Sequence, residues 1–264
     1  MALGLGLGLQ FNRFSGGGFD SDYQAVLDYA TSQGYTLPSD AQQILQNNLV
    51  IALKAGGIWA KLDSFSVFAT NGNIDFALID WIQLRTMTAV SSPTFTTNLG
   101  IQTNGTSSYI NTLFSGANDG VNYLTDTASF GWWANAPDIS GSEISGARDG
   151  TALNLSYIVN PTTSLINSDA FAILFASNTN NGLWHMNRTN ATDIQRIVNG
   201  VSSGNITSAS EGPTIQPFYL GALNGSGTAI TFDPNTFKVF FAGGDLLTES
   251  ADLYTAINTY ITAL

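Results

Sequence analysis

From residue 65 to residue 241, short apolar runs alternate with turn-forming dipeptides, and this rhythm limits the fold more than any other feature. Typical runs are residues 65–70, 128–133 and 237–241. Asn-Gly and Asp-Gly pairs, which favour tight turns between strands, recur at positions 104–105, 119–120, 149–150, 199–200 and 224–225. Many short strands at such spacing predict a mainly β protein, a sandwich or jelly roll.

Two segments follow a helical period instead. Residues 21–63 place apolar side chains three and four positions apart, which predicts a collar of short helices whose first N-cap is Asp20 or Ser21. Residues 248–264 predict a C-terminal helix with Thr248 as its cap. The buried positions expected in the second collar helix are Ile44, Leu45, Leu49, Ile51 (or, in its place, Val50) and Leu53.

Residues 1–20 predict an extended arm that ends in a glycine-rich hinge. Leucine occupies every second position near its start, so the leucines share one side of an extended chain while glycine leaves the other side bare. A lone strand is unstable, so we expect it to add to the edge of another sheet or to fill a groove. A signal peptide is not expected, because the segment has no positively charged start. The predicted anchoring residues are Leu3, Leu5, Leu7, Leu9 and Phe11.

The composition excludes several classes of partner. Only 10% of residues are charged, the net charge is −11, and three Lys and five Arg are scattered along the chain, so no basic patch for nucleic acid exists. No apolar run is long enough to predict a membrane span. The chain has no Cys and a single His, so neither disulfides nor a Cys- or His-based metal site is expected. No cofactor is predicted.

A glycoside hydrolase would need two carboxylates about 5–9.5 Å apart. The nearest candidates on an apolar background are Asp75 and Asp80, which would face opposite sides of a predicted strand. Glu143 lies in a stretch typical of a loop. The sequence therefore predicts no catalytic residue and a chain that is not an enzyme, with sugar hydrolysis by these three acids as a less favoured alternative.

Carbohydrate binding has its own candidates, Trp132, Trp133, Trp184 and His185. The first two indoles should lie on opposite faces of one strand, one in the core and the other exposed or under a loop. An exposed indole offers a flat apolar face to a sugar ring, although core packing or a subunit contact explains these residues as well. Calcium could bind loop carboxylates, for which Asp119, Asp138 and Asp149 are the candidates.

Several stretches in order resemble the concanavalin A-like (laminin G-like) jelly roll carried by bacteriophage virion structural proteins. They are residues 53–63 and 68–70, 93–98 and 105–110, 182–184, 187–189 and 198–200, and finally 218–222 and 240–248. The resemblance covers roughly residues 48–264. It implies the jelly-roll fold, and with the patterns described above the predicted division is residues 1–20 as the arm, 21–63 as the collar, and 64–264 as the sandwich with its terminal helix at 248–264.

The resemblance also implies a role. It predicts a head fibre, capsid decoration or tail-associated protein on the virion surface, whose partners are other virion proteins. A homo-oligomer, with a trimer as one arrangement, would fit such a surface. The alternative is an adhesin domain that binds host surface glycans.

Overall fold

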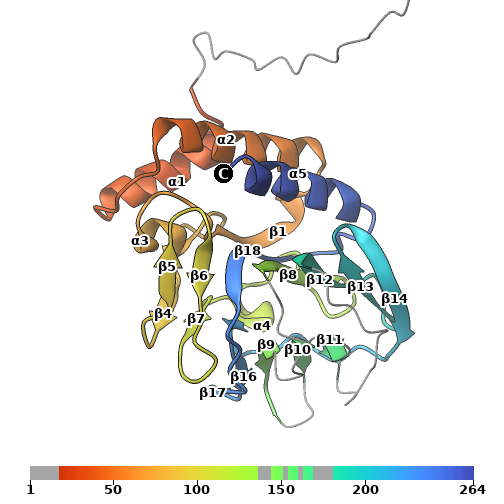
Figure 1. Cartoon of the computed structure of the whole chain (residues 1–264). Coiled ribbons are helices and arrows are strands. Elements are labelled where there is room, and N and C mark those ends of the chain that lie inside the picture. Colours follow the sequence, from red (N-terminus) through yellow and green to blue (C-terminus); the bar gives the residue numbers. More distant parts are fainter. Residues whose placement is uncertain (1–17, 136–143, 151–153, 160–162, 169–180) are drawn as a thin grey trace, which may run out of the picture.

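The computed structural model describes residues 18–135, 144–150, 154–159, 163–168 and 181–264. Two β-sheets lie face to face, and helices cover the outer face of one of them (Figure 1). The mainly β, jelly-roll-like class predicted from the sequence is therefore confirmed. The five predicted anchoring residues lie outside the described residues, as does Glu143.

The first sheet has β18 (Thr236–Gly243) near its centre. β8 pairs along one edge of β18, while β6 and β1 pair with successive parts of the other edge, through Phe237 with Ile101 and Phe241 with Phe65. The other strands, in order across the sheet, are β14 (Val201–Thr207), β13 (Asp193–Val198), β12 (Gly182–Arg188) and β8 (Ala128–Asn135) before β18, then β6 (Gly100–Gln102) and β5 (Thr94–Thr96), with β1 (Leu62–Val67) beside β18.

The second sheet closes the other side of the sandwich. Its order is β11 (Thr163–Ser168), β10 (Leu155–Val159), β9 (Ile144–Arg148), β15 (Tyr219–Leu220), β7 (Tyr109–Asn111) and β4 (Thr88–Val90), and the hairpin of β16 (Leu223–Gly225) and β17 (Thr228–Ile230) joins it through β9. Between the sheets lies an aromatic core, in which Phe130 stacks on Phe218 with ring centroids 4.9 Å apart. Burial of these large rings is the main force that holds the sheets together.

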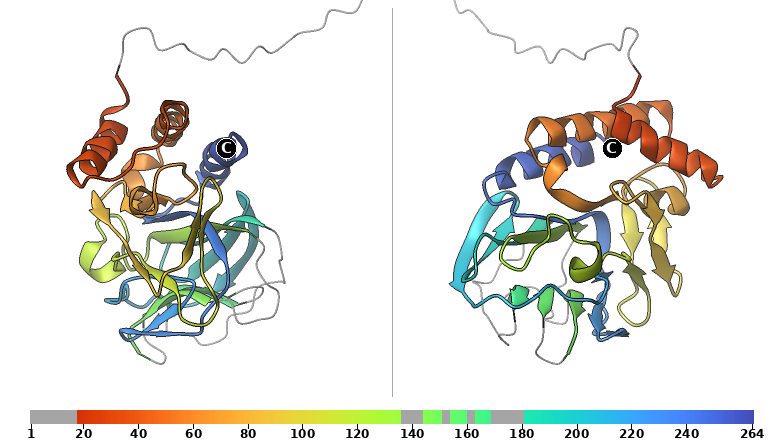
Figure 2. Two further views of the ribbon diagram at one scale, coloured as in Figure 1. Left: turned by 60° about the vertical axis from the view of Figure 1, so that its left-hand side comes forward. Right: turned by 180° about the vertical axis from the view of Figure 1, so that it is seen from behind.

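Three helices cover the other face of the first sheet: α1 (Ser21–Ser32), α2 (Asp40–Ala55) and α5 (Ser250–Thr262), as Figure 2 shows. The cap predicted at Asp20 is present, and Ser39 caps α2. A second apolar cluster joins the three helices to β1, β8, β12 and β18. Because side chains alternate along a strand, the first sheet buries one set of residues against the second sheet and the other set against the helices.

The junction between helices and sandwich contains short elements that the sequence did not indicate. They are η1 (Trp59–Lys61), α3 (Ile74–Ala77), β2 (Ile79–Asp80), β3 (Arg85–Thr86) and α4 (Gly116–Asp119). The single strand expected around Asp75 and Asp80 is wrong, because the Asn73 side chain caps α3 and places Asp75 in its first turn, while Asp80 lies in β2.

Two helix details also differ from expectation. Ile44 and Ile51 are 41% and 43% exposed, because the buried side of α2 runs through Gln46, Leu49 and Leu53 instead. The helix α5 begins at Ser250 rather than directly after Thr248, and its N-cap residue makes no capping bond with its side chain. None of the helices among the described residues is long and apolar enough to cross a membrane.

Candidate functional site

The four residues predicted to contact carbohydrate are all buried. Trp132, Trp133, Trp184 and His185 are 6%, 8%, 3% and 1% exposed, respectively. Trp132 and Trp184 point into the core between the sheets, and the guanidinium of Arg196 lies 5.4 Å from the Trp184 ring centroid. Trp132 and Trp133 therefore lie on opposite faces of β8, as predicted, and both faces are covered.

Trp133 and His185 lie on the helix side of the first sheet. Trp133 stacks on Tyr254 of α5, with ring centroids 5.9 Å apart and the planes 2° from parallel. His185 meets the Phe241 ring edge-on at 5.6 Å, and burial lowers its pKa to about 3, so the imidazole is neutral near pH 7. In this structure these side chains serve packing, and glycan contact through them stays a prediction.

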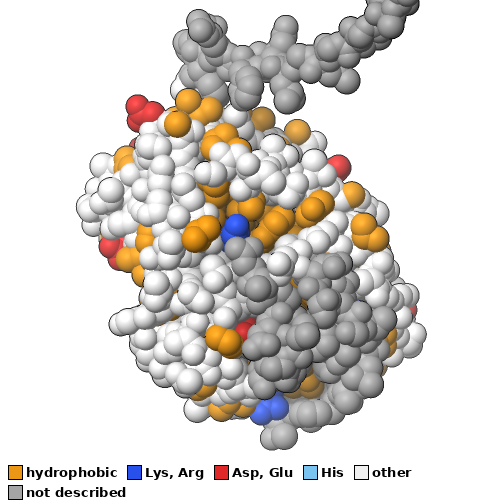
Figure 3. Space-filling view, in the orientation of Figure 1, with side chains coloured by type: hydrophobic (Ala, Val, Ile, Leu, Met, Phe, Trp, Pro, Cys, Tyr) orange, Lys and Arg blue, Asp and Glu red, His pale blue; other side chains and the backbone are white. Residues whose placement is uncertain are grey.

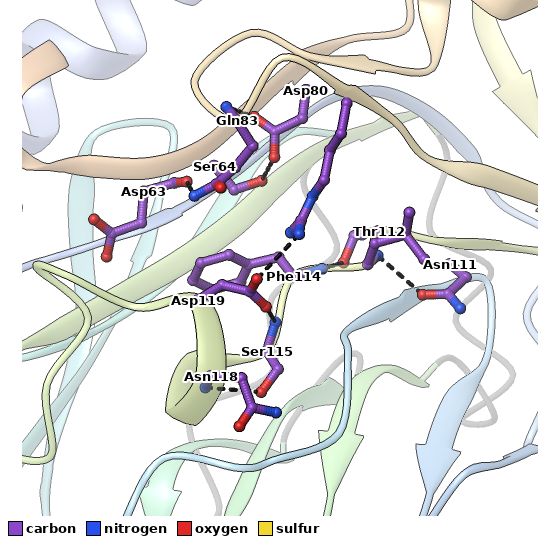
Figure 4. A network of polar contacts seen from close by, with 12 residues as sticks. Asp63, Ser64, Asp80, Gln83, Asn111, Thr112, Phe114, Ser115, Asn118 and Asp119 are labelled. Atoms are coloured by element: carbon purple, nitrogen blue, oxygen red, sulfur yellow. Dashed lines mark hydrogen bonds and ion pairs between the residues drawn. The ribbon is translucent and has the colours of Figure 1, made fainter.

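A polar network joins β1 to β2 and to the turn that follows β2, and Figure 4 shows its members Asp63, Ser64, Asp80 and Gln83. The Asp80 carboxylate is fully buried and accepts hydrogen bonds from the Ser64 hydroxyl at 2.7 Å and from the backbone N–H groups of Phe65, Ile82 and Gln83 at 3.0–3.2 Å. Burial raises its pKa, and these four donors act in the opposite direction. Asp80 thus fixes the turn after β2 to the start of β1.

Asp63 connects β1 to the segment at residues 121–123. Its carboxylate, 2% exposed, accepts hydrogen bonds from the N–H groups of Val121, Asn122 and Tyr123 at 2.7–3.1 Å. The Gln83 amide donates to the Asp63 carbonyl at 2.8 Å and so links the two carboxylate sites. Both carboxylates accept hydrogen bonds from backbone N–H groups, so they stabilise the local backbone structure.

Arg85 forms an ion pair with Asp119 at 3.0 Å, and Asp119 also accepts from the Ser115 N–H (Figure 4). Among the described residues, Nε and Nη2 of Arg85 are buried without a partner. Of the calcium candidates, Asp119 is engaged in this way, Asp149 accepts from Thr214 and Ile215, and Asp138 lies outside the described residues. In the described parts of the chain no three His, Cys, Asp or Glu side chains gather as metal ligands.

An open apolar groove of about 640 Å³ runs between α2 and α5. Leu45 and Leu49 of α2 and Tyr260 of α5 form its sides, and the small side chains of Ala52 and Ala256 leave room between the two helices. Figure 3 shows hydrophobic side chains gathered over this part of the molecule. Contiguous exposed apolar surface of this kind marks interaction sites, so the groove is the candidate functional site.

Sequence reasoning missed the groove because its two walls come from opposite ends of the chain. No pattern within α2 alone reveals that α5 runs beside it. The only local signal was the pair of exposed alanines, Ala52 and Ala55, on an otherwise amphipathic helix. Small residues on an exposed helix surface let another segment approach closely, but they indicate nothing until the neighbouring helix is known.

No known protein family matches the sequence, and no curated protein matches it. Among solved structures, the chain is similar to a Trypanosoma rangeli sialidase in complex with 2,3-difluorosialic acid, at 14% identity with a TM-score of 0.50, over 83% of this chain and 39% of that one. Others are domain 4 of AbnA, a GH43 extracellular arabinanase from Geobacillus stearothermophilus (15% identity, TM-score 0.40, 74% and 98% covered), and the receptor-binding domain of botulinum neurotoxin C/D mosaic serotype (10%, 0.44, 74% and 51%).

These similarities concern the fold, and the chain spans about two fifths of the sialidase. They correct one expectation. The prediction that the chain is not an enzyme is contradicted, because the sialidase that shares this fold over 83% of the chain is an enzyme. The lack of a recognisable acid pair in the sequence was too weak a ground for that prediction. The match to the sialidase supports the sandwich fold and gives no indication of a phage origin.

Proposed function

We propose that the chain is a structural component of a bacteriophage virion that attaches through its arm and its helical end, with the sandwich directed outward. A head fibre, a capsid decoration protein and a tail-associated protein all fit this arrangement. The proposal extends the sequence resemblance given above, and one structural observation supports it. The apolar α2/α5 groove lies at the end of the molecule where the described chain both begins and terminates.

The position of the two described chain ends indicates which side of the protein would face a partner. Gly18 precedes α1, and Leu264 follows α5, so both described ends lie on the helix side of the first sheet (Figure 2). The second sheet lies on the opposite side. A protein that attached through its arm would therefore turn its helices toward the partner and its second sheet away from it.

Incorporation into particles tests the proposal. Deletion of residues 1–17 should leave a folded sandwich, because these residues precede every described element, yet lower the amount of protein in gradient-purified particles by about tenfold or more. Ile51→Glu, on the exposed side of α2, should act in the same direction. The matched control is Val201→Glu on β14, where the side chain is 69% exposed on the sandwich. Normal incorporation of the truncated chain would contradict the proposal.

Assembly into a homo-oligomer belongs to the same proposal. The observation that favours it is again the groove, since an apolar surface at one end of each copy can be covered when copies meet. Light scattering on the purified chain, with and without residues 1–17, measures the mass directly. Monomers in both forms at all concentrations up to those in the particle would remove this part of the proposal.

A further inference from the structure

We propose that the α2/α5 groove is the docking site of the chain's own leucine–glycine segment, residues 3–9, in the unattached protein. The segment lies outside the described residues. Its composition, its reach and its charge all agree with this groove. The inference adds to the proposed function a statement about where the arm is held before attachment, and it is tested separately.

The segment and the groove are complementary in size. In the segment, Leu3, Leu5, Leu7 and Leu9 alternate with glycine, so one side is apolar and the other has no side chains. The groove offers small residues, Ala52, Ala55 and Ala256, between larger walls. Leucine side chains can enter between the helices, and burial of each contributes about 1.5–3 kcal/mol before ordering costs. Left in solvent, the same four leucines would form an aggregation-prone apolar strand.

The linker between the segment and α1 is long enough to reach the groove. The described chain starts beside α2, where the Asp20 N–H donates to Asn47 Oδ1 at 2.7 Å and Lys54 pairs with Asp20 at 2.6 Å. Residues 10–17 can span at most about 3.3–3.6 Å each, and so roughly 27 Å in total. A helix with its side chains is only about 10–12 Å wide. The segment can therefore cross the outer side of α2 and lie along the groove.

The charges of the linker and of the groove rim are opposite in sign. Residues 1–19 contain no Asp or Glu, and their only charged side chain is Arg13, in a protein whose net charge is −11. Asp252, exposed in the first turn of α5, lies at the groove. A cationic linker next to an acidic rim is favourable, although screening keeps such surface attraction small.

Tethering decides which copy supplies the segment. A short flexible linker gives its end an effective concentration in the millimolar range, well above the concentration of other copies in dilute solution. The segment of the same molecule therefore occupies the groove first. Attachment to a partner then requires its release, as in the exchange of an identical element between neighbours.

The absence of Cys from the sequence permits a direct test. Leu7→Cys is combined with Ala52→Cys on α2 or with Thr255→Cys on α5, two exposed positions that line the groove from opposite sides. The control combines Leu7→Cys with Gln24→Cys, an exposed position on α1 close to the root of the arm. Each protein is oxidised at about 1 μM, a concentration far below the tethered value, and is followed by free-thiol titration and non-reducing electrophoresis.

The expected result is a disulfide within one chain in at least one groove pair, formed about tenfold or more faster than in the control pair. Equal rates in all three pairs, no disulfide in either groove pair, or disulfides found only between two chains would overturn the proposal. Circular dichroism before oxidation confirms that each variant is folded. Loss of particle incorporation on deletion of residues 1–17 tests the proposed function alone, so either idea can fail without the other.

Discussion

The amide of Gln46 donates a hydrogen bond to the hydroxyl of Tyr260 at 3.1 Å, which joins α2 to α5 across 214 positions of sequence. The same fully buried Gln46 donates to Thr70 Oγ1 at 3.2 Å and accepts from the Tyr23 hydroxyl at 2.7 Å. The Gln46 side chain on α2 therefore contacts α1, α5 and Thr70, which lies three residues after β1. These contacts lie beneath the groove.

Replacement of that side chain should weaken the helical layer. Gln46→Leu keeps much of the volume but leaves three buried hydroxyl groups without this partner, so we expect a loss of about 2–4 kcal/mol in the free energy of unfolding. Urea unfolding followed by circular dichroism measures it. Gln24→Leu, at an exposed position on α1, is the control and should change stability by less than about 0.5 kcal/mol. If both substitutions lowered the free energy of unfolding by the same amount, the prediction that the Gln46 hydrogen bonds stabilise the helical layer would be contradicted.

His185 should make the protein sensitive to acid. Its folded pKa of about 3 lies below the unfolded value of about 6.5, so between these pH values the unfolded chain binds a proton that the folded chain does not. Stability from this group is complete above pH 6.5 and falls as the pH is lowered toward 3, by up to about 4–5 kcal/mol.

The variant His185→Leu isolates that contribution. Its unfolding free energy should lose the part of the acid slope that comes from the imidazole, while all carboxylates titrate as before. Denaturant unfolding at intervals from pH 7.5 to pH 3.5 gives the difference between the two proteins. Parallel curves over the whole range would show that the imidazole is not held neutral by burial.

Asp63 should be more important for stability than an average surface acid. Asp63→Ala removes the acceptor for three backbone N–H groups in the 121–123 segment, and we expect a loss of about 2–4 kcal/mol in unfolding free energy. Asp63→Asn keeps one oxygen acceptor and should lose less. Asp28→Ala on the exposed side of α1 is the matched control. Thermal unfolding of the three variants orders them, and a control that costs as much as Asp63→Ala would refute the prediction.

Trp133 should act as a joint between the sheet and α5. Trp133→Ala removes the ring that stacks on Tyr254, and we expect a loss of about 3–5 kcal/mol together with faster amide exchange in α5. Trp133→Phe should retain most of the contact. If Trp133→Ala is neutral for stability and instead abolishes binding on a glycan array, the carbohydrate-contact prediction for this residue gains support and the packing explanation fails.

Local signals in the sequence explain why part of the fold could be predicted. The helix cap at Asp20 and the alternation of Trp132 and Trp133 depend only on neighbours within a few residues. The local sequence pattern was therefore enough to predict both. The covered face of Trp133 could not be predicted in the same way. It depends on α5, which the chain reaches more than a hundred residues later.

The candidate site shows the same division. The leucine–glycine pattern of the arm is visible in the sequence, whereas the groove requires α2 and α5 to be placed side by side. Asp80 illustrates a different limit. Its apolar surroundings suggested a strand residue, but a side-chain cap at Asn73 and four hydrogen-bond donors to Asp80 decide the local structure.

The central position of β18 has a consequence for the order in which the protein can form. This strand follows β1, β6 and β8 in the sequence, and all three make hydrogen bonds to it. Until residues 236–243 are present, β8 pairs only with β12 and β6 only with β5, while β1 has no pairing strand among the described residues. The first sheet therefore cannot close before this segment is available, and a chain cut short before residue 236 should leave its aromatic strands free to pair with those of other chains.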